Sequence, residues 1–190
     1  QARLNVERLA GAATENVPIV GCEPSCLLTF HREYPSLVGT EELRKAAEAL
    51  APKVVLIDAF LDSLLQAGEL ELAFDRAKSG GRPVILHGHC HQKVFSSPAA
   101  GLRLLREAGF DADVTNASCC GMAGSFGYEK ENYELSEKAI ERGVLPALRE
   151  WPEAEVVVMG VSCRQQIDHF TDRRPKHLVE ALRDVLMDVP

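Results

Sequence analysis

Cys119 and Cys120, two adjacent cysteines, are the residues of this chain whose types and spacing are best suited to chemistry. A disulfide between neighbouring residues is strained, whereas both thiols can face one metal centre where the backbone bends sharply. Gly121, Gly124 and Gly127 follow within seven residues and permit such a bend. The pair therefore indicates metal binding rather than a cross-link.

More cysteines lie far away on both sides of this pair. Cys90 stands among alternating histidines in segment 87–91, and Cys163 ends the segment Gly-Val-Ser-Cys at 160–163. Soft thiolates gathered from distant loops select zinc, copper(I) or an iron–sulfur cluster. Cys26 is a weaker candidate, either a further metal ligand or a structural residue. The histidines are expected to orient the Cys90 loop through hydrogen bonds rather than to bind metal.

The composition narrows the class of protein. A chain of 190 residues with 46% hydrophobic and 26% charged residues is typical of a globular domain with an ample core, which does not need its six cysteines as disulfides. The net charge of -7 argues against nucleic acid as a partner. No apolar run is long enough to span a membrane. The chain starts at Gln1 in a helical pattern without a signal peptide, which we interpret as a segment of a longer, cytoplasmic protein.

Strand and helix patterns alternate along the chain, which predicts an α/β fold with a mostly parallel sheet. Segment 53–57 is compatible with a strand or with the start of a helix. Gly143 and Pro146 are expected to kink or end a long helix. Helices are expected over 2–13, 41–50 (with Thr40 as N-cap), 98–108, 131–149 and 176–187, and strands over 17–20, 83–86, 112–115 and 155–159.

A weak internal repeat relates the two ends of the chain. Segment 17–21 leads into Glu-Pro-Ser-Cys at 23–26, and segment 156–159 leads into Gly-Val-Ser-Cys at 160–163. Each strand would deliver a cysteine at its carboxyl end, where ligand sites of α/β sheets form. We therefore expect two pseudo-repeated halves, with short, mostly parallel sheets flanked by helices and cysteines at the strand C-terminal ends.

These motifs resemble the cysteine-rich CCG domain found in heterodisulfide reductase and in the iron–sulfur subunits of glycolate oxidase and anaerobic glycerol-3-phosphate dehydrogenase. The chain also resembles the carboxyl-terminal part of bacterial FAD-linked oxidases with fused iron–sulfur domains, of the D-2-hydroxyglutarate or D-lactate dehydrogenase type. The resemblance runs from about residue 17 to residue 166. Its motifs are segments 23–26, 87–93, 119–130 and 160–166.

The resemblance implies two repeats. Residues 1–80 would hold the tail of the first repeat with connecting helices, and residues 81–190 a complete second repeat. The sequence departs from the family pattern because Gly160 and Glu23 stand where the distal Cys-x-x-Cys has its first cysteine. The resemblance therefore implies four ligands of a 4Fe-4S cluster, cubane or non-cubane, which are Cys90, Cys119, Cys120 and Cys163. Cys26 is a fifth candidate.

The implied function is iron–sulfur electron transfer within a larger FAD-linked 2-hydroxy-acid dehydrogenase or oxidase. Electrons would pass from flavin and ferredoxin-type clusters to a quinone or a cytochrome, and peripheral attachment at the inner membrane would come through partners. The FAD would lie outside this chain, which is not expected to be catalytic alone. Two alternatives stay open, a redox-silent zinc module and a thiol–disulfide site at Cys119 and Cys120. Lys93, Arg164 and Arg173 could neutralise an anionic cluster or meet carboxylates of a partner, but solvated surface is the more usual place for such residues.

Overall fold

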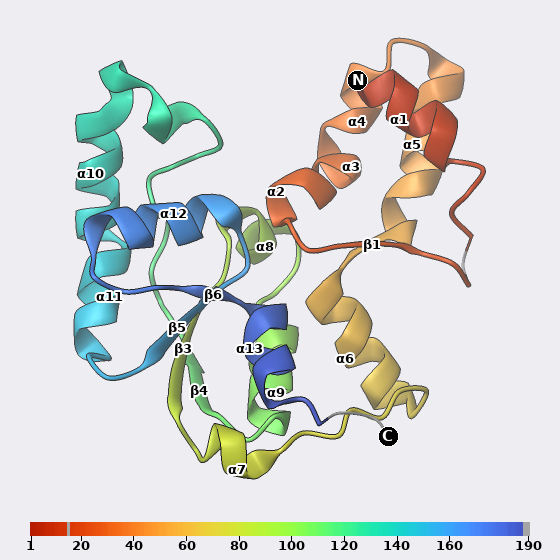
Figure 1. Cartoon of the computed structure of the whole chain (residues 1–190). Helices are drawn as coiled ribbons and strands as arrows, with labels where there is room; N and C mark the ends of the chain where they lie inside the picture. The colour runs from red at the N-terminus through yellow and green to blue at the C-terminus, as the bar shows by residue number, and fades with distance from the viewer. Residues whose placement is uncertain (15, 188–190) are drawn as a thin grey trace. The chain divides into compact units, whose positions relative to one another are not determined.

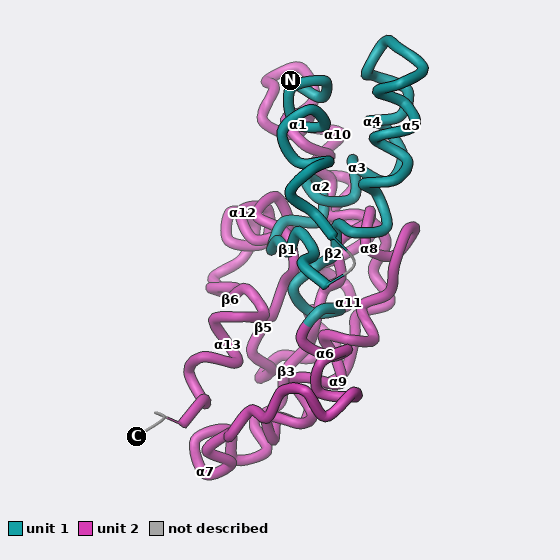
Figure 2. The backbone as a smooth tube through the Cα atoms, turned by 90° about the vertical axis from the view of Figure 1, so that its right-hand side faces the viewer, with its two compact units in different colours: residues 1–60 teal, residues 61–190 magenta. Residues whose placement is uncertain are grey.

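Two short parallel sheets flanked by helices make up the computed structural model, which describes residues 1–14 and 16–187 (Figure 1). This confirms the predicted α/β class. The chain divides into two compact units, unit 1 over residues 1–60 and unit 2 over residues 61–190 (Figure 2). The division falls within helix α6 (Ile57–Ala67), whereas the predicted boundary follows residue 80. The assignment of the two parts to sequence repeats stays a prediction.

Unit 1 holds a two-stranded parallel sheet of β1 (Ile19–Gly21) and β2 (Val54–Leu56). Segment 53–57 thus contains both predicted alternatives, because α6 starts directly after β2. The helix expected over 2–13 is shorter, and Gly11, a poor helix former, follows its last turn. The helices of unit 1 are α1 (Ala2–Leu9), α2 (Pro24–Leu27), α3 (Thr29–Arg32), α4 (Tyr34–Leu37) and α5 (Glu41–Leu50), with a 3₁₀ turn at Ala51–Lys53.

Helix α5 begins where its sequence predicts. Thr40 is the N-cap, and its Oγ1 accepts a hydrogen bond of 3.3 Å from the Leu43 N–H. Glu41 and Glu42 occupy the first turn, where carboxylates face the positive end of the helix dipole. Unit 1 contains two small apolar clusters. The buried residues are Ala13, Phe30, Leu50 and Val54 in one cluster and Val6, Val38 and Ala47 in the other.

Unit 2 is built on a four-stranded parallel sheet with the strand order β4-β3-β5-β6. Ile85 at its centre is opposite Asp113 on one side and Val156 on the other. The strands are β3 (Pro83–His87), β4 (Asp111–Val114), β5 (Glu155–Val158) and β6 (Lys176–His177). The helices after α6 are α7 (Arg76–Ser79), α8 (Cys90–Phe95), α9 (Ala99–Glu107), α10 (Tyr133–Arg142), α11 (Val144–Glu150), α12 (Val161–Phe170) and α13 (Leu178–Val185), with 3₁₀ turns at Phe126–Tyr128 and Lys130–Asn132.

Alternate side chains of the central strands enter two different cores, because successive residues of a strand point to opposite faces. Val84 and Leu86 pack with α9 and α13 on one face of the sheet, and Ile85 packs with α10, α11 and α12 on the other (Figure 1). Each fully buried leucine or isoleucine contributes about 1.5–3 kcal/mol to folding. Cys120 and Cys163 belong to the second core, here called the α10–α12 core.

Two helix predictions are corrected at their ends. The single helix expected over 131–149 is two helices, α10 and α11. Gly143 separates them, at one of the two positions where a kink or an end is expected. The last helix starts at Leu178 rather than residue 176, because β6 precedes it and His177 is its N-cap. The Glu180 side chain accepts a hydrogen bond of 2.7 Å from the His177 N–H and completes a capping box.

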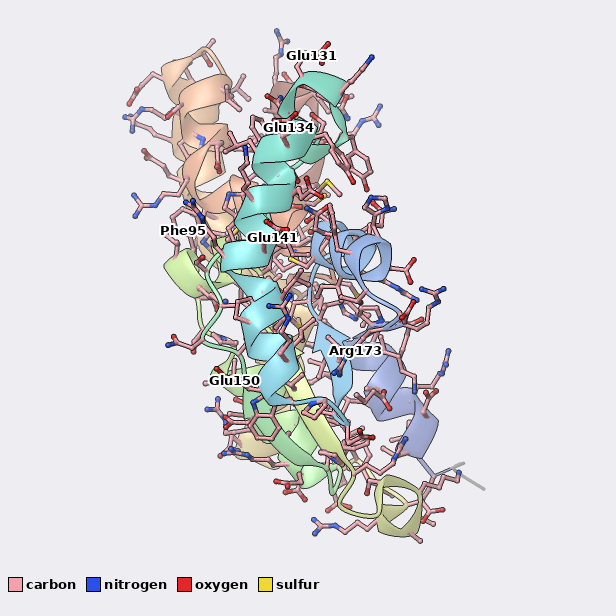
Figure 3. All side chains as sticks on the ribbon, turned by 90° about the vertical axis from the view of Figure 1, so that its left-hand side faces the viewer. Phe95, Glu131, Glu134, Glu141, Glu150 and Arg173 are labelled. Atoms are coloured by element: carbon pink, nitrogen blue, oxygen red, sulfur yellow. The ribbon has the colours of Figure 1, made fainter. Side chains whose placement is uncertain are left out.

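The outer side of α10 and α11 carries exposed charges of both signs, with Lys138, Arg142 and Arg149 among them. Figure 3 labels four exposed carboxylates that follow one another along these helices and the turn before them, Glu131, Glu134, Glu141 and Glu150. They agree with the negative net charge of the chain. Across the part of the chain that the structure describes, no helix has the length and apolar character needed to cross a membrane.

Candidate metal centre

The four principal cysteines lie in the segments that follow three neighbouring parallel strands of unit 2. Cys90 is the first residue of α8, just after β3, and Cys163 lies in the first turn of α12, just after β5. Cys119 and Cys120 follow β4. Because β4, β3 and β5 are adjacent and parallel, their carboxyl ends share one edge of the sheet. The structure therefore brings these cysteines together where their placement in the sequence predicts.

The side chains of the four cysteines form one continuous hydrogen-bonded group, here called the sulfur group. Cys90 interacts with Cys119, and Cys120, whose thiol has a single proton, interacts with both Cys119 and Cys163. The vicinal pair thus connects the cysteine of α8 to the cysteine of α12. No disulfide is formed, since all six cysteines of the chain are free.

The pKa values of the four cysteines shift in opposite directions. Interactions with Cys120 and Cys90 hold the pKa of Cys119 well below its usual range, and interaction with Cys120 does the same for Cys163. Interaction with Cys119, together with burial, raises the pKa values of Cys90 and Cys120. Thiolate is the form of cysteine that binds metals, and the surroundings of Cys119 and Cys163 favour that form.

Backbone N–H groups also point at three of the sulfurs. The Gly121 N–H donates to Cys119 Sγ over 3.3 Å, and the N–H groups of His91 and Met122 offset part of the rise in the pKa values of Cys90 and Cys120. Gly121 has a φ of 94°, which turns the chain back toward the sulfurs. Donors of this kind stabilise thiolates and tune iron–sulfur clusters.

Close packing against α10 fixes the loop that carries the vicinal pair. A Cβ at Gly121 would lie 2.3 Å from the Ser136 carbonyl oxygen, and a Cβ at Gly127 would lie 2.6 Å from Ser136 Oγ. Ser136 is buried and accepts a hydrogen bond of 2.8 Å from Gln166 Nε2 on α12. One buried serine therefore links the loop, α10 and the helix that carries Cys163.

The histidines of segment 87–91 contact the cysteines and their loops. His87 is fully buried, its Nδ1 lies 3.0 Å from Thr115 Oγ1, and its ring helps to lower the pKa of Cys163. Among the residues that the structure describes, His87 Nε2 has no nitrogen or oxygen partner. His89 Nδ1 accepts the His91 N–H over 3.2 Å and lies 3.9 Å from Cys90 Sγ.

The three basic residues singled out in the sequence occupy different places. Lys93 is partly buried beside the sulfur group, and its Nζ donates to the Ala117 carbonyl. Arg164 forms an ion pair of 3.0 Å with Glu180. Arg173, labelled in Figure 3, donates to a set of backbone carbonyls, those of Leu148, Trp151, Pro152 and Ala154. Solvated surface is therefore wrong for Lys93, which lies beside the cysteines as the second sequence-based alternative has it.

Cys26 belongs to unit 1, within α2, and is exposed. Glu23 caps this helix by accepting hydrogen bonds from the Ser25 N–H and from Ser25 Oγ. The role of Cys26 as a metal ligand stays a prediction.

The donor set of unit 2 fits a soft metal centre. In the described residues, no three or more His, Cys, Asp or Glu side chains surround a single metal-ion position. The sulfur group nevertheless supplies four soft donors, two of them with lowered pKa values, beside a buried histidine nitrogen without a nitrogen or oxygen partner. Cysteine sulfur suits iron–sulfur clusters and zinc equally by its softness.

Comparison with known proteins finds related oxidoreductases. The chain is 28% identical to D-2-hydroxyglutarate dehydrogenase of Pseudomonas putida over 189 residues, and 26% identical to that of Escherichia coli over 187 residues. It is 28% identical over 189 residues to one of the subunits of anaerobic glycerol-3-phosphate dehydrogenase of Escherichia coli. These matches cover 94%, 97% and 98% of this chain.

The chain spans only part of each relative, 16% and 17% of the two D-2-hydroxyglutarate dehydrogenases and 45% of the glycerol-3-phosphate dehydrogenase polypeptide. No family model and no solved structure matches the chain. The matched region is the C-terminal part of these proteins. The chain is therefore related in sequence to a C-terminal segment shared by D-2-hydroxyglutarate dehydrogenases and by one of the polypeptides of anaerobic glycerol-3-phosphate dehydrogenase.

Proposed function

We propose that this chain is the iron–sulfur electron-transfer domain of a larger FAD-linked 2-hydroxy-acid dehydrogenase or oxidase. The observation that carries the proposal is the sulfur group, in which four cysteines from the ends of three parallel strands contact one another. The names of the relatives support an oxidoreductase. Four cysteine sulfurs match the ligand number of a four-iron cluster.

In this proposal the cluster ligands are Cys90, Cys119, Cys120 and Cys163. A bound cluster would supply one-electron storage at a potential set by its surroundings. The residues of the chain hold and insulate that site: the Gly121 N–H hydrogen-bonds to sulfur, and apolar side chains of the α10–α12 core, such as Met122 and Ile167, exclude water from its inner side.

The electrons would come from flavin and ferredoxin-type clusters elsewhere in the parent protein, and would leave to a quinone or a cytochrome. The FAD site would lie outside these residues, so this chain alone should show no dehydrogenase turnover. The parent protein would work in the cytoplasm, with any attachment to the inner membrane made through its partners. These roles follow from the relatives, of which this chain matches a part.

The depressed pKa of Cys119 favours a second candidate, a thiol–disulfide site at the vicinal pair, since a thiolate is the reactive form of cysteine. Redox-silent zinc held by the same sulfurs is the third. The three candidates predict different metal contents and different behaviour of cysteine variants, so one set of samples separates them.

The decisive measurement is the iron, acid-labile sulfide and zinc content of anaerobically prepared protein, with an EPR spectrum of each sample. We expect about four irons and four sulfides per chain, with a signal that appears on oxidation or reduction. One zinc without sulfide would contradict electron transfer. Protein without metal, but with a vicinal pair that oxidises and reduces reversibly, would support the thiol–disulfide site.

Cysteine variants identify the ligands. Cys120→Ser should lose most of the iron and the visible absorbance, because Cys120 touches both Cys119 and Cys163. Cys22→Ser, at an exposed cysteine of unit 1, is the matched control and should keep the iron content of the wild type. Cys26→Ser tests the fifth candidate, since loss of iron in this variant would establish Cys26 as a ligand.

A further inference from the structure

Lys93 lies between two of the segments that carry the cysteines. It belongs to α8, one helical turn after Cys90, so the two side chains lie on the same side of the helix. Its Nζ donates a hydrogen bond to the carbonyl of Ala117, two residues before Cys119. The ammonium group is therefore held at the loop of the vicinal pair, on the same side of α8 as Cys90.

The ammonium group of Lys93 has no carboxylate partner among the residues that the structure describes, in contrast to other cations of unit 2. Arg164 pairs with Glu180 at 3.0 Å, and Lys176 pairs with Glu155 and Asp184 at 3.0 Å each. The negative groups that act on Lys93 are instead the four cysteine sulfurs, each of which interacts with it electrostatically. The sulfur group is thus the counter-charge of this lysine.

The partly buried environment of Lys93 strengthens its electrostatic interaction with the cysteines. The side chain is partly buried, and its stem packs over Gly88, where an added Cβ would lie 3.3 Å from Lys93 Cε. A buried ammonium is costly unless an opposite charge meets it, and one neutral carbonyl does not provide that charge. Charges interact more strongly here than at the surface, because the screening by water is reduced.

We propose that Lys93 is the fixed positive charge that compensates the anionic sulfur site and raises the reduction potential of the cluster bound there. This inference rests on the proposed function. Reduction adds one negative charge to the cluster, and a nearby cation stabilises that added charge more than it stabilises the oxidised state. Lys93 therefore acts through its charge, without being a ligand or touching the electron donor.

The test compares three variants of the full chain, prepared anaerobically and reconstituted with iron and sulfide. Lys93→Met removes the charge and keeps the length of the side chain, whereas Lys93→Arg keeps the charge. Lys138→Met removes a matched positive charge from the exposed face of α10. Iron and sulfide contents are measured first, and the midpoint potential is then determined by an EPR-monitored redox titration.

We expect Lys93→Met to hold as much iron and sulfide as the wild type and to shift its midpoint potential to more negative values. Lys93→Arg and Lys138→Met should both remain near the wild-type potential. If Lys93→Met loses the cluster while Lys93→Arg keeps it, the charge is needed even for assembly, which also supports the inference.

Other outcomes overturn it. A fully loaded Lys93→Met protein with the wild-type potential would show that the charge does not act on the cluster. Loss of the cluster in both Lys93 variants would assign the lysine a purely structural role. Wild-type protein without iron and sulfide would instead refute the proposed function itself, so the two failures are distinguished by the wild-type metal content.

Discussion

Cys119 and Cys120 are neighbours in the chain but connect different parts of the sulfur group. Cys119 accepts a hydrogen bond from Cys90 on α8, and Cys120 donates to Cys163 on α12. The sharp turn at Gly121, whose φ is 94°, allows adjacent residues to serve both neighbours. The geometry of the site therefore depends on this glycine as much as on the thiols.

Substitution of Gly121 by alanine should destabilise unit 2 and impair metal loading. A left-handed backbone costs an L-residue about 1–2 kcal/mol, and the new Cβ would also overlap the Ser136 carbonyl, which lies 2.3 Å from its position. We expect a loss of roughly 3 kcal/mol or more in the free energy of unfolding, as in overpacked cores. Urea denaturation and iron content measure the two effects.

Gly124→Ala is the matched control for this substitution. Gly124 also has a positive φ, of 69°, but nothing lies within 4 Å of its added Cβ. Its alanine variant should lose only the backbone term of about 1–2 kcal/mol and keep its iron. Equal effects of the two substitutions would mean that the contact between the loop and α10 is unimportant.

The residues of the site differ in how far the sequence predicts them. The four cysteines are predictable because thiols are rare and each follows a recognisable strand or glycine-rich segment. Ser136 and Gln166 escape prediction, since a hydrogen bond between residues 30 positions apart leaves no local pattern. For Lys93 the sequence leaves two places open, the solvated surface and the neighbourhood of an anionic cluster, because its spacing from Cys90 is visible in the sequence but its burial depends on the fold.

At the scale of elements, short segments account for most of the differences between prediction and structure. Strand β6 has only two residues, too few for a periodic pattern, so the sequence assigns them to the last helix. The single-turn helix α4 escapes prediction for the same reason, and the helix that Ser25 and Cys26 are expected to open is divided into the single turns α2 and α3. The longer strands β3 and β5 and helix α5 agree with their predictions within one or two residues.

The capping box of α13 gives an element-scale prediction. Glu180 accepts hydrogen bonds from the His177 N–H at 2.7 Å and from Arg164 at 3.0 Å, and the first of these is the main cause of its lowered pKa. Glu180→Ala should lower the free energy of unfolding at pH 7 by about 1 kcal/mol, the usual value of a helix cap. Glu141→Ala, at an exposed carboxylate of α10, is the control and should have little effect.

The effect of Glu180→Ala should depend on pH. A carboxylate with a lower pKa in the folded state stabilises the protein above the pKa of the unfolded state, about 4.3, and loses this effect as the pH falls through the folded pKa. The wild type and the variant should therefore approach each other in stability at an acidic pH below the folded-state pKa of Glu180. An unchanged difference at that pH, measured by urea denaturation, would show that the charge of Glu180 is not involved.

At the scale of the molecule, one optical signal reports on unit 2 alone and another reports on both compact units. Trp151 is the single tryptophan of the chain, and it packs against the α10–α12 core that contains Cys120 and Cys163. Its fluorescence therefore reports on unit 2, whereas far-ultraviolet circular dichroism reports on the helices of both units. A ligand that binds only a folded state raises the stability of the unit that holds it.

We expect removal of the metal to lower the unfolding midpoint seen by Trp151 fluorescence. The circular dichroism curve should then separate into two steps, because unit 1 does not share the metal-dependent stabilisation. Denaturation in urea of loaded and chelator-treated protein, followed by both signals, tests this prediction. Coincident curves that shift together would mean that the units unfold as one cooperative body.

The parallel pairing of β3 with β5 has a consequence for the order of events during synthesis. Ile85 is opposite Val156, so the two strands that present Cys90 and Cys163 are separated by about 70 residues of chain. Contacts between distant residues form late and slowly in folding. During synthesis, Cys90 and Cys163 therefore cannot meet until the residues between these two strands have been made. Until then oxidants have access to Cys90, and under the proposed function a cluster could be inserted only after the sheet has paired.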